Sequence, residues 1–212
     1  MFERIKKYFK RQDNKKTWGD ITLKDFYEIK NIMEIQDEYT IYNLIDYIYK
    51  VDSSKMDITE LYKYSVDFLS EPIPVKDIKI KEKYTINGRK YISNVNLTKI
   101  TCSQFIDFTN YVRQSPEEFE KLISVFFIPE GHEYNDGYDM KEVQRDILQL
   151  PIAVVQAMSF FMMREFQTYA VIFQLYLTEE IAKMKNIPEN LKQQMEEIEA
   201  EVIRLACFPS LL

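Results

Sequence analysis

The stretches ITLKDFYEIKN at residues 21–31 and ITCSQFIDFTN at residues 100–110 carry the pattern that organises this chain. Both open with Ile-Thr, place apolar or aromatic side chains at corresponding positions and end on asparagine. A threonine can cap the start of a helix, and an acidic or amide side chain three positions later completes a capping box. Gln104 fills that position in the second stretch, and Asp25 approximates it in the first. The two stretches therefore predict helices that begin alike, 79 residues apart.

A second helix is predicted after each start, because apolar side chains recur with the spacing i, i+3, i+4, i+7 and i+8. This stripe comprises Ile41, Leu44, Ile45, Ile48 and Tyr49 in the first copy and Phe119, Leu122, Ile123, Phe126 and Phe127 in the second. The dipeptide Ser115-Pro116 predicts a capping serine and a first-turn proline for the second of these helices. Asp57 and Asp139 each precede similar acidic and apolar residues, which predicts a third helix in each copy.

The segment between the copies favours strands. Within residues 78–95, the run YTINGRKYI at 84–92 places β-branched and aromatic residues around Asn87-Gly88, a pair suited to a type I′ turn. After the second copy, we predict a long apolar helix at 151–177 and a charged helix at 188–206.

We therefore predict a mainly α fold with a minor β part: a pseudo-duplicated helical bundle, a β-hairpin inserted between the copies and a long C-terminal helical region. The four glycines among 212 residues favour helices over strands closed by glycine turns. Apolar spacing that arises by chance is the alternative to a duplication. The predicted units are a basic amphipathic arm (1–17), helical repeat 1 (18–75), the hairpin insertion (76–98), helical repeat 2 with the long apolar helix (99–186) and a charged C-terminal helix (187–212).

Few residues suit catalysis. His132 is the single histidine, and the sequence contains no phosphate-loop, dinucleotide-binding or zinc-ligand spacing. Cys102 and Cys207 lack CxxC spacing, so we interpret both as buried thiols on helices. The polar loop at 130–139 is the best metal candidate, but its spacing departs from an EF-hand, and an ordinary loop is the favoured interpretation. We predict a protein that is not an enzyme and uses no cofactor.

Two segments are candidate partner-binding surfaces. The arm holds seven Lys/Arg against two acidic residues, and its candidate contacts are Phe2, Ile5 and Phe9, which share one helical side. Protein docking is its favoured interpretation, with nucleic-acid contact and an anionic membrane surface as alternatives. In the long apolar helix, the candidate contacts are Met158, Phe161, Met162, Phe166, Tyr169 and Phe173. The alternative for that helix is a position in the core.

No signal peptide and no membrane span are expected. The first 16 residues alternate charged and aromatic side chains, so they lack an uninterrupted apolar region. Arg164 and Glu165 interrupt the long apolar helix, and charges at the centre of a bilayer are costly. We also expect no sequence-specific contact with nucleic acid.

The order of WGDIT (18–22), INGRKY (86–91), KITCSQFIDF (99–108) and SVFFIPEG (124–131) resembles small proteins of tailed bacteriophages, especially phages of gut Bacteroidetes that include the crAss-like group. Such proteins are regarded as tail assembly chaperones or as virion structural proteins. The resemblance covers roughly residues 17–177 and contains no catalytic signature. It implies a non-enzymatic assembly protein, in the host cytoplasm or in the virion, whose partners are other phage structural proteins or further copies of itself. A connector, ring or internal component of the virion is the alternative to a chaperone.

Overall fold

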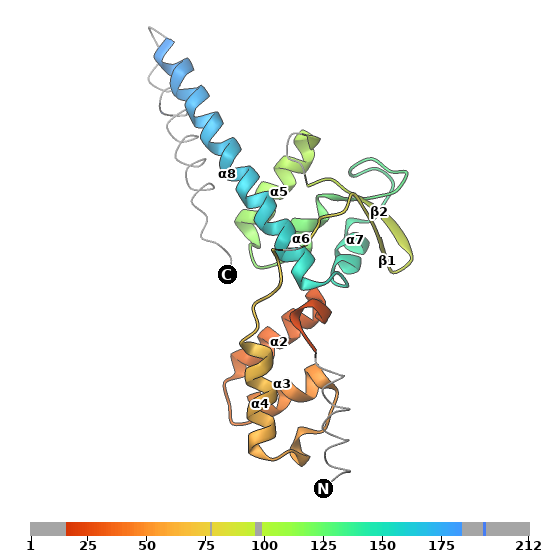
Figure 1. The fold of residues 1–212 in the computed structure, drawn as a ribbon. Helices are drawn as coiled ribbons and strands as arrows, with labels where there is room; N and C mark the ends of the chain where they lie inside the picture. The colour runs from red at the N-terminus through yellow and green to blue at the C-terminus, as the bar shows by residue number, and fades with distance from the viewer. Residues whose placement is uncertain (1–15, 77, 96–98, 184–192, 194–212) are drawn as a thin grey trace.

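The computed structural model describes residues 16–76, 78–95, 99–183 and 193 (Figure 1). Within these residues the chain is mainly helical with one small antiparallel sheet, which confirms the predicted fold class. Most of the predicted arm (1–15) and nearly all of the predicted charged helix (187–192 and 194–212) lie outside the described residues.

The first helical region follows a short 3-10 turn, Trp18–Asp20, and consists of three helices, α2 (Leu23–Ile35), α3 (Thr40–Tyr49) and α4 (Ile58–Leu69). A second 3-10 turn, Ser53–Lys55, precedes α4. Thr22 caps α2 with a complete capping box, since its hydroxyl accepts from the Asp25 N–H at 3.1 Å and its own N–H donates to the Asp25 carboxylate at 3.2 Å. Asp57 caps α4. The helix α3 packs against both α2 and α4.

The second helical region has the same order of three helices, α5 (Cys102–Gln114), α6 (Phe119–Ser124) and α7 (Met140–Ile147). Thr101 and Gln104 form the predicted capping box of α5, and Asp139 caps α7. The corresponding starts of the first and third helices are therefore confirmed. The helix α6 packs against α5 and α7.

The second helix of this region departs from the prediction at both ends. Ser115 does not cap α6: its N–H donates to the carbonyl of Tyr111 and closes α5, while α6 begins after Glu118. The apolar stripe also runs past the end of the helix, because Phe127 belongs to a strand. The pair Ile128-Pro129 favours the strand that follows, since a residue before proline is disfavoured in a helix and favoured in extended backbone.

The sheet contains the predicted hairpin, β1 (Lys83–Ile86) and β2 (Arg89–Ser93), and a third strand, β3 (Phe127–Pro129). The strand order is β1-β2-β3, with both pairs antiparallel. Asn87 and Gly88 have φ angles of 49° and 78°, as a type I′ turn requires. The sequence predicted the hairpin but not β3, which attaches the hairpin to the second region.

The longest helix, α8, spans Ile152–Lys183, so it continues beyond the predicted end at residue 177. Its length is roughly 48 Å at 1.5 Å per residue. Figure 1 shows its N-terminal half inside the body of the protein and its C-terminal half standing away from the other described elements.

A backbone junction joins the two regions. The first two N–H groups of α2, at Leu23 and Lys24, donate to the carbonyls of Leu150 and Leu148 at 2.8 and 2.9 Å. In the other direction, the N–H of Ile152 donates to the carbonyl of Ile21 at 2.8 Å. The start of a helix leaves N–H groups without partners inside the helix, and here the turn between α7 and α8 satisfies them.

A single apolar core runs through both regions. Its fully buried side chains come from α2, α3, α4, β2, α5, α6, β3, α7 and α8, and the largest are Tyr91, Phe68, Phe108, Phe126 and Phe127. The two regions are therefore packed together as one body.

Candidate functional site

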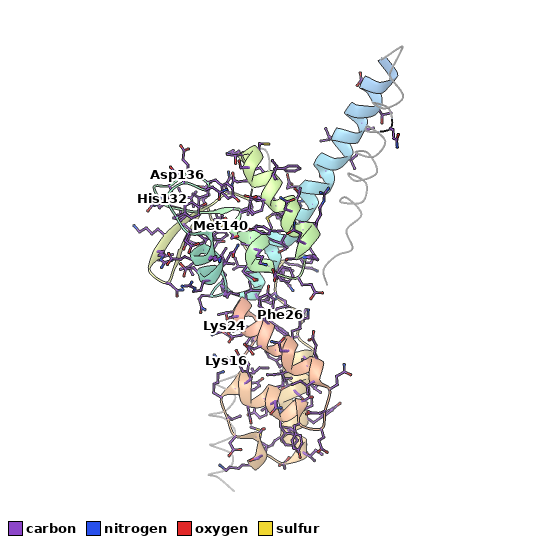
Figure 2. The ribbon with its side chains drawn as sticks, turned by 180° about the vertical axis from the view of Figure 1, so that it is seen from behind. Lys16, Lys24, Phe26, His132, Asp136 and Met140 are labelled. Atoms are coloured by element: carbon purple, nitrogen blue, oxygen red, sulfur yellow. The ribbon has the colours of Figure 1, made fainter. Side chains whose placement is uncertain are left out.

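The loop at residues 130–139 holds itself together with its own polar groups. His132 Nδ1 lies 3.0 Å from the carbonyl oxygen of Asp136, and Figure 2 shows both residues in this loop. The Tyr134 hydroxyl donates to Asp107 of α5 at 2.7 Å, and burial beside this carboxylate raises the pKa of Tyr134. Across the described residues, no group of three or more His, Cys, Asp or Glu side chains is placed to hold a metal. The contacts of this loop are those of a connection tethered to α5.

A second polar cluster surrounds the buried carboxylate of Asp146 in α7. The Asp146 carboxylate accepts hydrogen bonds from the Tyr91 hydroxyl at 2.6 Å and from the side-chain amide of Asn87 at 2.8 Å. Arg89 lies 3.4 Å from the same carboxylate and 3.0 Å from Glu142. Burial, with the hydrogen bond to Asp146, raises the pKa of Tyr91 to about 12. Both the carboxylate and the phenol are covered, so this cluster anchors the hairpin on α7.

The helix α4 presents an apolar face to solvent. Ile58 is 78% exposed and Tyr62 is 70% exposed, and Val66 and Leu69 continue the same line at 40% and 41%. These four residues, which we call the α4 stripe, are spaced i, i+4, i+8 and i+11, so they lie within roughly 80° around the helix. A neighbouring stripe on the same helix, Leu61, Ser65 and Phe68, is buried against α3 and the core. Apart from Ser65, about half of the circumference of α4 thus carries apolar and aromatic side chains, and only part of it is covered.

The predicted contacts in the long apolar helix divide between core and surface. Met158 and Met162 are 0% and 2% exposed and belong to the common core, so a partner reaches neither side chain in this structure. These two methionines therefore lie in the core, which was the alternative to a partner-binding surface for this helix. Phe161 is half-buried, and the guanidinium of Arg164 lies 5.4 Å from the centre of its ring.

The remaining predicted contacts have no described side chain. They are Phe166, Tyr169 and Phe173 in α8 and Phe2, Ile5 and Phe9 in the arm. One other prediction is wrong: Cys102 is exposed at the start of α5 instead of buried, because it occupies the first turn on the side away from the core residue Phe108. Cys207 lies outside the described residues.

A further exposed face lies on the outer half of α8. Val171, Ile172 and Leu175 are 52%, 55% and 67% exposed. Arg164 and Thr168 precede them on the same side of the helix, and Glu179 follows them. We call this set the α8 face.

No family model, curated protein or solved structure matches this chain. The kind of site therefore has to be inferred from the structure of this chain. Across the described part of the chain, no helix has the length and apolar character that a membrane crossing requires, and this includes α8.

Sequence reasoning missed the α4 stripe, although its spacing is visible in the sequence. The positions 58, 62, 66 and 69 repeat like a core stripe, and the true core stripe at 61, 65 and 68 lies beside them. Two adjacent stripes on one 12-residue helix exceed what a neighbour on one side can cover. This surplus of apolar positions is the feature of the sequence that predicts an exposed apolar face on α4.

Proposed function

We propose that this protein is a non-enzymatic bacteriophage assembly protein, similar to a tail assembly chaperone, that binds amphipathic segments of other phage proteins. The observation that supports binding is the α4 stripe, whose first two residues are more than two-thirds exposed. The phage origin of the partners is supported by the sequence resemblance described above. Both the infected host cytoplasm and the virion are compatible with this proposal.

The α4 stripe is suited to a helical client. A partner helix with apolar residues at i, i+4 and i+7 can lay them along Ile58, Tyr62 and Val66, as in helix-in-groove recognition. Burying a large apolar side chain contributes about 1.5–3 kcal/mol, so three or four such contacts give useful affinity after the cost of association. Covering the apolar face of a client in this way protects the client from aggregation until assembly.

The binding experiment uses the full chain, tagged and produced in infected cells. The double variant Ile58→Glu/Tyr62→Glu places two charges on the stripe and is expected to lose its co-purified phage proteins, as identified by mass spectrometry. Thr59→Glu is the matched control, because Thr59 is exposed on the same helix but outside the stripe, and it should retain them. Equal recovery of the same phage proteins with both variants would exclude α4 as the client site.

Mass spectrometry of purified virions separates a chaperone from a virion component. A chaperone is expected in infected cells and absent from virions. Abundant, stoichiometric peptides of this protein in virions would contradict the chaperone proposal and favour a connector, ring or internal component.

A further inference from the structure

The α4 stripe has the spacing of a surface that receives a helix. Ile58, Tyr62 and Val66 follow one another at intervals of four residues and span about 12 Å along α4. Leu69 continues the line at the C-terminal end of the helix. All four side chains are exposed, so the stripe can accept an occupant along its whole length.

The described chain begins beside the C-terminal end of α4. The ring of Trp18 lies 4.4 Å from the ring of Phe68, which is the neighbour of Leu69 in the sequence. Lys16 is the first described residue, two positions before Trp18, and Figure 2 shows it at the first helical region. Residues 1–15 of the arm are therefore attached close to one end of the stripe.

The arm matches the stripe in spacing. Phe2, Ile5 and Phe9 recur at intervals of three and four residues. On the helix that this spacing predicts, they share one side and span about 10.5 Å, which is close to the length of the first three stripe residues. One apolar side chain of the arm can therefore lie at each of these three positions.

The arm is also long enough to reach the stripe. Residues 10–15 separate Phe9 from the first described residue, and six extended residues bridge up to about 20 Å. Because the attachment lies at the C-terminal end of α4, the residues of the arm nearest to the attachment reach that end first. The arm and α4 then run in the same direction.

Charge favours the arm over the other terminal segment as the occupant. Residues 1–15 carry six Lys/Arg against two acidic residues. The α4 segment, residues 57–71, carries four acidic residues against one lysine, and the first region, residues 18–75, carries twelve against five. These counts include both signs, so pairs formed within the region cancel. Residues 184–212 carry five acidic residues against three Lys/Arg, and they follow the end of α8 that Figure 1 shows far from α4.

We propose that residues 1–15 of the arm dock on the α4 stripe of the same chain and occupy it until a client displaces them. The contact itself follows from the exposed stripe, the attachment of the arm and the opposite charges. Its regulatory role rests on the proposed function of the stripe as the client site. From the attached end, the apolar contacts are Phe9 with Val66, Ile5 with Tyr62 and Phe2 with Ile58.

Attachment makes a weak contact sufficient for this role. A segment held by a short flexible linker has an effective concentration of about 1 mM at its site. A contact with an intrinsic dissociation constant of about 0.1 mM is then formed about nine-tenths of the time. It raises the apparent dissociation constant of a competing client about 10-fold. A client with a larger apolar face still displaces the arm, so the arm discriminates against weak clients.

Disulfide trapping in the full chain tests the contact. In a background of Cys102→Ser and Cys207→Ser, Ile5→Cys is combined with Tyr62→Cys on the stripe. In the matched control, Ile5→Cys is combined with Asp67→Cys, which lies on another side of the same helix and is also exposed. The pair on the stripe is expected to form a disulfide within one chain about 10-fold faster than the control pair.

Two results would overturn the docking of the arm. Equal rates for the two pairs would mean that the arm has no preference for the stripe, since Asp67 lies closer to the attached end of the arm. Disulfides that form only between two chains would assign the stripe to the arm of a second copy. Mass spectrometry without reduction separates the two kinds of disulfide.

The regulatory role is tested by charging the apolar side of the arm in the full chain. Ile5→Glu/Phe9→Glu is expected to free the stripe and to raise the yield of phage proteins co-purified from infected cells about 10-fold. Lys7→Gln/Arg11→Gln is the matched control, because it changes the net charge by the same amount on the opposite side of the arm. Its yield should rise by about 2-fold or less.

An unchanged or lower yield with Ile5→Glu/Phe9→Glu would overturn the regulatory role, and a lower yield would mean that the arm itself holds clients. Failure of the proposed function gives a different result, because then no variant and no unmodified chain co-purifies phage proteins. The disulfide rates still decide whether the arm docks on the stripe in that case.

Discussion

The two helical regions begin with the same capping box, yet their third helices end up in different surroundings. In the second region, α7 packs against α6 and β3, and its Asp146 holds the hairpin through Tyr91 and Asn87. In the first region, α4 has no such sheet beside it, and Ile58 and Tyr62 remain exposed. The comparison teaches that apolar positions shared by the two third helices are packed in one region and exposed in the other, because the two helices have different neighbours.

Corresponding positions support this comparison. With Asp57 placed on Asp139, Ile58 of α4 corresponds to Met140 of α7, and Val66 corresponds to Leu148. Met140 and Leu148 are partly buried and pack against the core, while their counterparts in α4 face solvent. Two of the four stripe positions are therefore packed in one region and exposed in the other, while Tyr62 and Leu69 correspond to Gln144 and Pro151.

The largest expected effect comes from removing the carboxylate that anchors the hairpin on α7. Asp146→Ala leaves the buried Tyr91 hydroxyl and the Asn87 amide without their acceptor and removes a partner of Arg89. The free energy of unfolding in urea should fall by roughly 3–5 kcal/mol. Hydrogen exchange of the β1 and β2 amides should accelerate more than that of α4.

Asp67→Ala is the matched control for this change, because Asp67 is an exposed acid on the uncovered helix α4. Its effect on stability should lie within about 0.5 kcal/mol. A similar loss in both variants would break the comparison between the anchored helix and the open one.

The second prediction concerns alkaline pH. The pKa of Tyr91 is raised to about 12 in the folded protein, against about 10 in the unfolded chain. The neutral phenol therefore contributes stability that is complete below about pH 10 and is lost as the pH rises towards 12. The free energy of unfolding, measured with urea, should fall between about pH 9 and about pH 11.5. This fall should be smaller by about 2 kcal/mol in Tyr91→Phe than in the unmodified chain. An unchanged drop would mean that this phenol is not coupled to Asp146 as described.

How far the sequence predicts this arrangement depends on the range of each interaction. Capping by Thr22 and Thr101, the helix starts after Asp57 and Asp139, and the Asn87-Gly88 turn are local, and the sequence indicated all of them. The strand β3 depends on pairing with β2, which lies more than 30 residues earlier in the chain, and periodicity alone assigned Phe127 to a helix. The exposed α4 stripe was missed for the same reason, since burial depends on distant neighbours.

The smallest effect concerns a side-chain contact between the two regions. The hydroxyl of Tyr27 in α2 accepts from the N–H of Phe119 at 2.7 Å and donates to the carboxylate of Glu120 at 2.7 Å, so it caps α6. Burial and this neighbouring carboxylate raise the pKa of Tyr27 well above its ordinary value. Tyr27→Phe should lower the free energy of unfolding by about 1–2 kcal/mol, measured by urea unfolding.

Tyr62→Phe provides the control, because its ring is largely exposed on α4 and the change should be nearly neutral. If Tyr27→Phe were equally neutral, this side-chain contact would not contribute to the coupling of the two regions. The coupling would then rest on the backbone junction and the shared apolar core.

The backbone junction also bears on how the protein is made. At this junction, Thr22 forms an isolated antiparallel β-bridge with Pro151. The ribosome adds Pro151 about 130 residues after Thr22. At about 5–20 residues per second, that interval is roughly 6 to 26 seconds. During it, α2, α3 and α4 have already left the ribosome in sequence order, while the first N–H groups of α2 still lack the carbonyls of Leu148 and Leu150. In a newly made chain, the apolar first region is therefore exposed to solvent for seconds before the second region is available to pack against it.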